Sequence, residues 1–190
     1  PLFAVGYSLG GNALLKLCAK HQPNLRGSVA ISSPINLKAS SEAINKGFSR
    51  VYQYHLLKSM KHKFISKMQR VNMKDYIRVT AKHINTFETF YDFDEHLTAP
   101  IHGFSGADDY YKRASAKPEL HKITTNTLIL HAADDPFMDE QVIPNKHELS
   151  PTVAYELAQK GGHVGFMQRK SGRLTTYIPE RIGRFIEELT

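Results

Sequence analysis

The chain has 190 residues and a formal net charge of +7, with 41% hydrophobic and 23% charged residues, proportions that exclude a disordered chain, a collagen-like repeat and a coiled coil. No run of about 18 apolar residues is present, which excludes a transmembrane helix within the sequence. The single cysteine, Cys18, excludes an internal disulfide and a cysteine-rich zinc site, and it fits a reducing compartment, so we expect a cytoplasmic protein.

Short apolar runs bounded by turn residues alternate with helical patterns toward both ends of the chain. The runs are rich in Val, Ile and Leu, as buried strands are. Strands separated by helices are typical of a mostly parallel sheet flanked by helices, the α/β architecture. The expected strands are residues 2–5, 27–32, 127–131 and 152–157, and the expected helices are residues 12–20 and 178–189.

The segment between the second and third expected strands has a different character. Residues 37–118 are mostly helical in pattern, aromatic and basic. Because the segment is too long for a simple crossover, we expect a helical cap inserted into one α/β domain. The aromatic pairs Phe90-Tyr91 and Tyr110-Tyr111 would pack within this cap or, alternatively, line an acyl pocket.

Positive charge is concentrated in residues 55–84, where eight basic residues face one acid, Asp75, so this segment alone accounts for the net +7. Basic and apolar side chains each recur there at helical spacing, as two stripes of one amphipathic helix would. The basic stripe is either a solvated face or a surface for weak contact with an anionic membrane. We expect no nucleic acid partner, because no zinc-finger spacing or RNA-binding aromatic motif accompanies the charge. The basic stripe is Lys63, Lys67, Arg70, Lys74, Arg78 and Lys82, and the apolar stripe is Leu57, Met60, Phe64, Met68 and Val71.

The residues Gly6-Tyr7-Ser8-Leu9-Gly10 match the G-x-S-x-G nucleophile elbow, with an apolar strand before the motif and a helix after it. A serine hydroxyl is a weak nucleophile that must be presented in the open beside a base, and a tight strand-to-helix turn presents it so. We expect both flanking glycines to be there because side chains would clash in this turn. We also expect the helix N-terminus to direct the N–H of Leu9 at a developing oxyanion.

An acid and then a histidine must follow Ser8 in chain order in this architecture. Asp134 and Asp135 directly follow the third expected strand, and His163 follows the fourth. Sites of open α/β sheets form at the carboxyl ends of strands, so we expect His163 to take the proton from Ser8 and an aspartate to orient its imidazole. We favour Asp135 because Pro136 follows it and can hold the turn, whereas Asp134 would bond turn amides.

Other residues of chemical interest receive simpler interpretations. We expect His131 to be a buried histidine with its hydrogen bonds satisfied, and Cys18 to pack in the core. The remaining histidines show no metal-ligand spacing, so we expect no metal. Tyr7, Phe137 and Phe166 adjoin the expected triad in sequence and would line the substrate pocket.

Three stretches resemble the YheT-type group of the AB hydrolase 4 family, and the resemblance extends over the whole chain. It implies an α/β-hydrolase fold, hydrolysis of carboxylic esters by a serine nucleophile, and no cofactor. It also implies that Ser8, Asp135 and His163 form the catalytic triad. The three stretches are GYSLGGNALLK at 6–16, DDPFM at 134–138 and GGHVGF at 161–166.

The same resemblance implies that family members carry further strands before the elbow, with a His-Gly loop that supplies the second oxyanion N–H. We therefore expect residues 1–190 to be the C-terminal portion of one α/β-hydrolase domain. The expected substrates are small-molecule or lipid esters, with short- to medium-chain acyl groups among them. The alternatives are acyl transfer on the same triad and an inactive, truncated copy.

Overall fold

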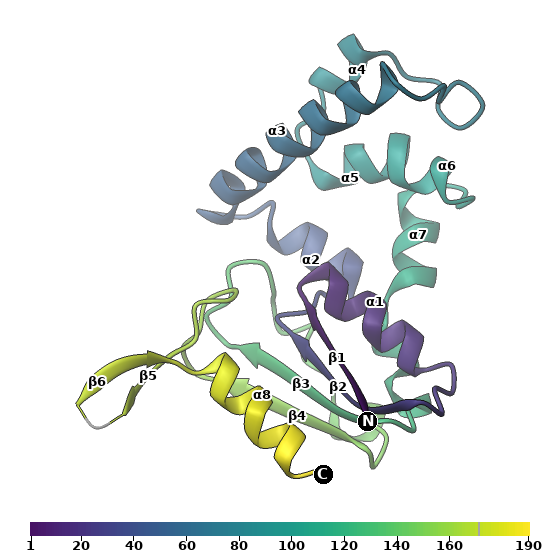
Figure 1. Ribbon diagram of the computed structural model, residues 1–190. Helices are drawn as coiled ribbons and strands as arrows, with labels where there is room; N and C mark the ends of the chain where they lie inside the picture. The colour runs from purple at the N-terminus through teal and green to yellow at the C-terminus, as the bar shows by residue number, and fades with distance from the viewer. Residues whose placement is uncertain (171) are drawn as a thin grey trace. The chain divides into compact units, whose positions relative to one another are not determined.

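The computed structural model describes residues 1–170 and 172–190, and the chain divides into two compact units (Figure 1). The sheet unit comprises Pro1–Asn36 and Ser115–Thr190, and the helical unit comprises Leu37–Ala114. The predicted insertion begins where the helical unit begins, but its last predicted residues, 115–118, belong to the sheet unit.

The sheet unit has the alternation of strands and helices that the sequence predicts. Its elements are β1 (Leu2–Tyr7), α1 (Leu9–Cys18), β2 (Leu25–Ile31), the 3₁₀ helix η2 (Lys117–Lys122), β3 (Asn126–Ala132), the 3₁₀ helix η3 (Lys146–Glu148), β4 (Val153–Ala158), β5 (Met167–Lys170), β6 (Arg173–Thr176) and α8 (Ile178–Glu187). The first four strands form one parallel sheet in the order β1-β2-β3-β4. This confirms the predicted α/β fold class.

Helices cover both faces of the sheet, so β2 and β3 are buried along nearly their whole length. Alternate residues of a strand face opposite sides. Val29 and Ile31 pack with Phe185 of α8 in one core, whereas Ser28 on the other face accepts a 3.4 Å hydrogen bond from Cys18 of α1. Figure 1 shows α1 and α8 on these two sides. Cys18 is fully buried, as predicted for core packing.

β1 is an edge strand of this sheet. Among the described residues only β2 pairs with it, and the side chains of Leu2 and Val5 are 60% and 41% exposed. Unpaired backbone groups beside exposed apolar side chains are a template for a further strand.

Two elements of the sheet unit differ from the prediction. α1 begins at Leu9 rather than at residue 12. The sequence did not predict this first turn, because Gly10 and Gly11 have low helix propensity. β5 and β6 form an antiparallel hairpin that was not predicted. Each strand has four largely exposed residues, too short a pattern for apolar alternation to reveal.

The helical unit has its own core, to which α3, α4 and α5 contribute buried residues such as Leu57, Ile84 and Phe93. A capping box at Thr89 and Asp92 starts α5. The elements of the unit are α2 (Leu37–Ala43), α3 (Ser49–Met68), α4 (Ala81–Asn85), α5 (Phe90–Phe93), the π-helical turn η1 (Asp94–Thr98), α6 (Ala99–Ile101) and α7 (Ala107–Ala114).

The helix predicted through the basic segment ends early. α3 stops at Met68, and soon after it the Asn72 side chain accepts the N–H of Lys74 at 3.2 Å, a local bond that competes with helix formation. Of the predicted basic stripe only Lys63 and Lys67 lie on α3. The prediction of one continuous helical stripe is therefore wrong.

The predicted apolar stripe faces inward. Leu57 is buried, and Met60, Phe64 and Met68 pack against the core of the helical unit, so this face of α3 is occupied. Val71 is 46% exposed and lies beyond the helix end. Within residues 1–170 and 172–190, no helix combines the length and the apolar character needed to cross a bilayer.

Candidate active site

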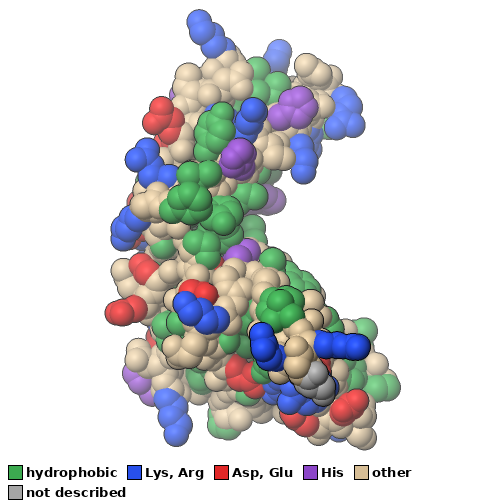
Figure 2. Space-filling model, turned by 90° about the vertical axis from the view of Figure 1, so that its left-hand side faces the viewer, with side chains coloured by type: hydrophobic (Ala, Val, Ile, Leu, Met, Phe, Trp, Pro, Cys, Tyr) green, Lys and Arg blue, Asp and Glu red, His purple; other side chains and the backbone are tan. Residues whose placement is uncertain are grey.

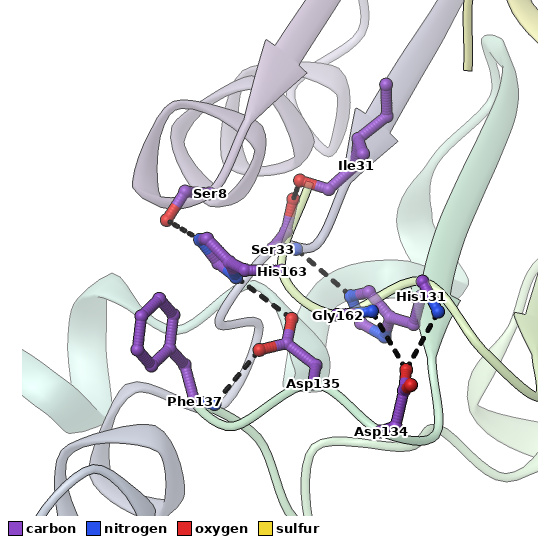
Figure 3. Close-up of polar contacts among 10 residues, drawn as sticks. Ser8, Ile31, Ser33, His131, Asp134, Asp135, Phe137, Gly162 and His163 are labelled. Atoms are coloured by element: carbon purple, nitrogen blue, oxygen red, sulfur yellow. Dashed lines mark hydrogen bonds and ion pairs between the residues drawn. The ribbon is translucent and has the colours of Figure 1, made fainter. Parts of the chain in front are cut away.

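Ser8 occupies the turn between β1 and α1 with a backbone conformation that L-residues rarely adopt, at φ 50° and ψ −128°. Its N–H donates to the carbonyl of Ile31 in β2 at 2.8 Å, and its own carbonyl accepts the N–H of Gly11 at 3.0 Å. The neighbouring strand and the first turn of α1 thus hold the strained residue. In this conformation the Ser8 hydroxyl faces His163 (Figure 3).

Gly6 and Gly11, rather than Gly6 and Gly10, are the glycines that this turn requires. A Cβ at Gly6 would lie 2.7 Å from the carbonyl oxygen of Gly10. A Cβ at Gly11 would collide with Ser33 Oγ and lie 2.9 Å from the carbonyl oxygen of Gly6. Apart from its chain neighbours and the backbone of its own helix, no described atom lies within 4 Å of a Cβ built on Gly10. The expectation that both motif glycines prevent a clash is met at Gly6 and is wrong at Gly10.

The backbone strain at Ser8 should lower the stability of the fold. Glycine adopts positive φ freely, so the free energy of unfolding of Ser8→Gly should exceed that of Ser8→Ala by about 1 kcal/mol. This difference is the ~1–3 kcal/mol of strain that glycine relieves, less the entropy that glycine loses on folding. Both variants lose the hydroxyl, so the comparison isolates the backbone. Denaturant unfolding measures it, and equal stabilities would show that Ser8 stores no strain.

Three side chains from separate segments meet at the carboxyl end of the sheet (Figure 3). His163 Nε2 lies 3.0 Å from Ser8 Oγ, and His163 Nδ1 lies 2.9 Å from Asp135 Oδ2. The buried Asp135 carboxylate accepts the N–H of Phe137 at 2.9 Å through its other oxygen. Pro136 has no N–H, so Phe137 offers the first amide after the acid. The Phe137 ring packs edge-on against the imidazole, with centroids 4.4 Å apart.

Asp134 is exposed and contacts a different part of the site. Its Oδ1 accepts the N–H groups of Gly162 and Gly161, each at 2.8 Å (Figure 3). The hydrogen bond from Gly162, together with that from Gly161, holds the pKa of the Asp134 carboxyl below its ordinary value. Asp134 therefore ties the loop that carries His163 to the end of β3, whereas Asp135 touches the imidazole itself.

His131 of β3 is buried behind the triad with both ring nitrogens engaged, as predicted for a satisfied core histidine. Nε2 accepts the N–H of Ser33 at 3.1 Å, and Nδ1 lies 3.0 Å from the hydroxyl of Tyr155. Because Nε2 accepts, the neutral ring carries its proton on Nδ1 and donates it to Tyr155. Burial lowers the pKa of His131 to about 4, although the Asp135 carboxylate opposes this.

This buried imidazole predicts an acid-sensitive fold. The unfolded chain binds the His131 proton near pH 6.5 and the folded chain only near pH 4, so stability is fully present above pH 6.5 and is lost as the pH falls toward 4. At about 1.4 kcal/mol per pKa unit, the loss is about 3 kcal/mol. Urea unfolding at several pH values should show a shallower fall for His131→Gln, which keeps an acceptor for Ser33. An unchanged pH dependence would contradict this.

The other predicted site residues have different outcomes. The Leu9 N–H belongs to the first turn of α1, where backbone N–H groups have no partner within the helix. Tyr7 ends β1 and is 46% exposed; its place in a pocket stays a prediction. Phe166 is 2% exposed and packs in the core, because the N–H of Tyr177 binds its carbonyl at 2.9 Å and Gly161 leaves room for its ring. The pocket prediction for Phe166 is therefore wrong. Within the described ranges no cluster of three metal-binding side chains exists.

The elbow after β1, an acid after β3 and a histidine after β4, all on one parallel sheet, define an α/β hydrolase. The sequence agrees with this assignment, since a sequence model of the alpha/beta hydrolase fold matches residues 1–170. The chain belongs to this family.

Sequence identity relates the chain to particular members of the family. The chain is 44% identical to "Putative esterase YheT" of Escherichia coli (strain K12), over 88% of this chain and 49% of that protein, which confirms the resemblance seen in the motifs. It is 28% identical to the human "Phospholipase ABHD3", over 100% of this chain and 46% of that protein. The chain thus spans about half the length of the curated relatives it matches. The crystal structure of VinJ shares the fold, with a TM-score of 0.51 and 16% identity over 99% of this chain and 66% of that chain.

Proposed function

We propose that the protein containing these residues is a serine hydrolase that cleaves carboxylic esters through an acyl-enzyme. One observation carries the proposal: the His163 ring bonds Ser8 Oγ with one nitrogen and the buried Asp135 carboxylate with the other. A base held between a nucleophile and an orienting acid is the arrangement that activates a serine hydroxyl.

Each residue then has a defined step. His163 Nε2 takes the proton as Ser8 Oγ attacks the ester carbonyl, and Asp135 stabilises the imidazolium that forms. The oxyanion accepts a hydrogen bond from the Leu9 N–H at the positive end of α1. A His-Gly loop before the elbow, which the resemblance to the AB hydrolase 4 family implies, would donate the second N–H. His163 returns the proton to the leaving alcohol, and water then hydrolyses the acyl-enzyme by the same route. No step in this scheme needs a cofactor.

The proposed substrates are lipid or other small-molecule esters. The relatives named as an esterase and a phospholipase support this class, within which we propose short- to medium-chain acyl esters or lipid esters. Acyl transfer would use the same triad with an alcohol in place of water, so product analysis with an added alcohol separates it from hydrolysis. We propose no nucleic acid partner, and we propose the cytoplasm as location on the basis of the one unpaired cysteine, Cys18.

A fluorophosphonate probe tests the nucleophile directly in the natural, full-length protein. We expect covalent labelling at Ser8, abolished by Ser8→Ala and unchanged by Ser105→Ala, which removes an exposed hydroxyl elsewhere. Mass spectrometry of the labelled peptide identifies the site. Undiminished labelling of Ser8→Ala would sink the assignment, and labelling without ester turnover would support an inactive copy.

A further inference from the structure

α3 carries apolar side chains on both of its faces. The inner face, with Leu57 at its centre, packs in the core of the helical unit. The outer face exposes large apolar side chains to solvent, and the ring of Phe48 contacts that of Tyr52 edge-on with centroids 5.9 Å apart. Residues four apart lie on one side of a helix, so Phe48, Tyr52 and Leu56 form one apolar row along this outer face. The exposed fractions in this row are Phe48 74%, Tyr52 45% and Leu56 45%. Val51 and Tyr54, which are 46% and 61% exposed, lie on the flank of α3 that lines a groove.

Positive charge surrounds this outer face without local compensation. From residue 43 to residue 74 the sequence contains no Asp or Glu. No ion pair joins Arg50, Lys58 or Lys63 to an acid within the described residues. Lys61 donates to the carbonyls of Asn85 and Phe87, which position the ammonium group but do not neutralise it. The basic residues of this stretch are Lys46, Arg50, Lys58, Lys61, Lys63, Lys67, Arg70 and Lys74.

A groove of about 1360 Å³ runs beside the same helix within the helical unit. Arg50, Lys58 and His62 line it together with the apolar side chains of Val51 and Tyr54, and one carboxylate, that of Glu88, is among the lining groups. Figure 2 shows hydrophobic side chains gathered on one face at the height of α3, with Lys, Arg, His and acidic side chains near them. The surface is thus apolar at its centre, cationic at its rim and hollowed at one side.

We propose that the outer face of α3, from Phe48 to Lys63, docks on an anionic phospholipid surface. Aromatic rings partition into the interfacial layer of a bilayer. Lys and Arg stems lie along apolar contacts while their charged ends meet anionic headgroups. A second copy of this chain is a poor occupant, because a two-fold contact would oppose two uncompensated cationic rims.

Of the stripe residues that the sequence predicts, the proposed docking surface draws only on Lys63. The stripe residues Leu57, Met60 and Phe64 are taken up by the core. The apolar row of Phe48, Tyr52 and Leu56 lies on another side of α3 and nearer its N-terminus, and Arg50 and Lys58 lie at the groove on its flank. The inference goes beyond the proposed hydrolysis, since no triad residue takes part. Docking through this face would place the protein at a lipid surface, which contains lipid esters.

Vesicle sedimentation of the natural, full-length protein tests the inference, with Ser8→Ala in every sample so that hydrolysis does not alter the lipid. We expect binding to phosphatidylcholine vesicles that contain phosphatidylglycerol, weak binding to phosphatidylcholine alone, and release between about 0.05 M and about 0.5 M salt as screening shortens the range of the charges. The variant Arg50→Gln/Lys58→Gln/Lys63→Gln should lower the partition coefficient about 100-fold. Phe48→Ser/Tyr52→Ser should lower it at least about tenfold.

A matched charge control separates the α3 face from net charge. Lys20→Gln/Lys122→Gln/Arg173→Gln removes as many exposed cations from the sheet unit and should change binding little. Equal losses in the two triple variants, or no binding of the parent at low salt, overturn the proposal. Without lipid binding, a dimer broken by Phe48→Ser/Tyr52→Ser assigns the face to a second copy, and a loss of stability in that variant assigns it to another segment of the protein.

Turnover of a water-soluble ester, measured with Ser8 intact, keeps the two proposals distinguishable. The α3 variants should hydrolyse it as the parent does. Vesicle binding without ester turnover would support the docking surface and contradict the proposed function. Ester turnover without vesicle binding would support the proposed function and contradict the docking surface.

Discussion

Asp135→Asn should lower kcat for ester hydrolysis by about 10⁴-fold, while Asp134→Asn lowers it by no more than about tenfold. The Asp135 carboxylate lies 2.9 Å from His163 Nδ1 and is buried, so it both selects the tautomer and stabilises the imidazolium. An amide at this position bears no charge and can donate to Nδ1, which favours the wrong tautomer. An amide at 134 still presents a carbonyl oxygen to the N–H groups of Gly161 and Gly162, with weaker bonds.

Steady-state kinetics on a water-soluble ester measures the difference, with unfolding curves to show that both variants fold. Asp139→Asn is the matched control, because Asp139 lies in the same segment and its side chain accepts only the N–H of Gln141 among the contacts described. A loss at Asp134 equal to or greater than that at Asp135 would reverse the assignment. A loss at Asp134 that appears in kcat and is recovered in Asp134→Glu would show that the loop bonds position His163.

The three site residues could be predicted from the sequence because each follows a strand of one parallel sheet. The carboxyl ends of parallel strands meet at one edge, so the order Ser8, Asp135, His163 is enough to place their side chains near one another, as the structure does. The choice of Asp135 over Asp134 needed only the observation that Pro136 follows Asp135 and can hold the turn that aims its side chain. The fold class followed from the same alternation of strands and helices.

The direction of a side chain in a loop could not be predicted in the same way. Phe166 is three residues from His163, and nothing in that spacing shows that its ring turns into the core. The prediction for the basic segment was wrong for a related reason. Lys and Arg continue at helical spacing past Met68, although the helix ends there. Which side of α3 is covered depends on partners such as Ile84 and Phe93, which lie far along the chain.

Substitutions at two adjacent glycines, Gly10 and Gly11, should have opposite effects on stability, although the sequence does not distinguish the two positions. Gly11→Ala should lower the free energy of unfolding by about 3 kcal/mol and reduce turnover, because its Cβ would collide with Ser33 Oγ and press on the carbonyl of Gly6, displacing the strand-to-helix turn that presents Ser8. Gly10→Ala should raise the free energy of unfolding by about 0.5–1 kcal/mol, because the position is helical and open and alanine has the higher helix propensity.

Denaturant unfolding of both variants, with turnover measured beside it, tests this pair. Ser33→Gly in the Gly11→Ala background should restore part of the stability by removing the hydroxyl that the new methyl group meets, while the close approach to Gly6 remains. The order of the two variants is the critical result. A destabilised Gly10→Ala would mean that another part of the full-length protein packs on the elbow at that position, and an unchanged Gly11→Ala would mean that the turn has room to relax around Ser8.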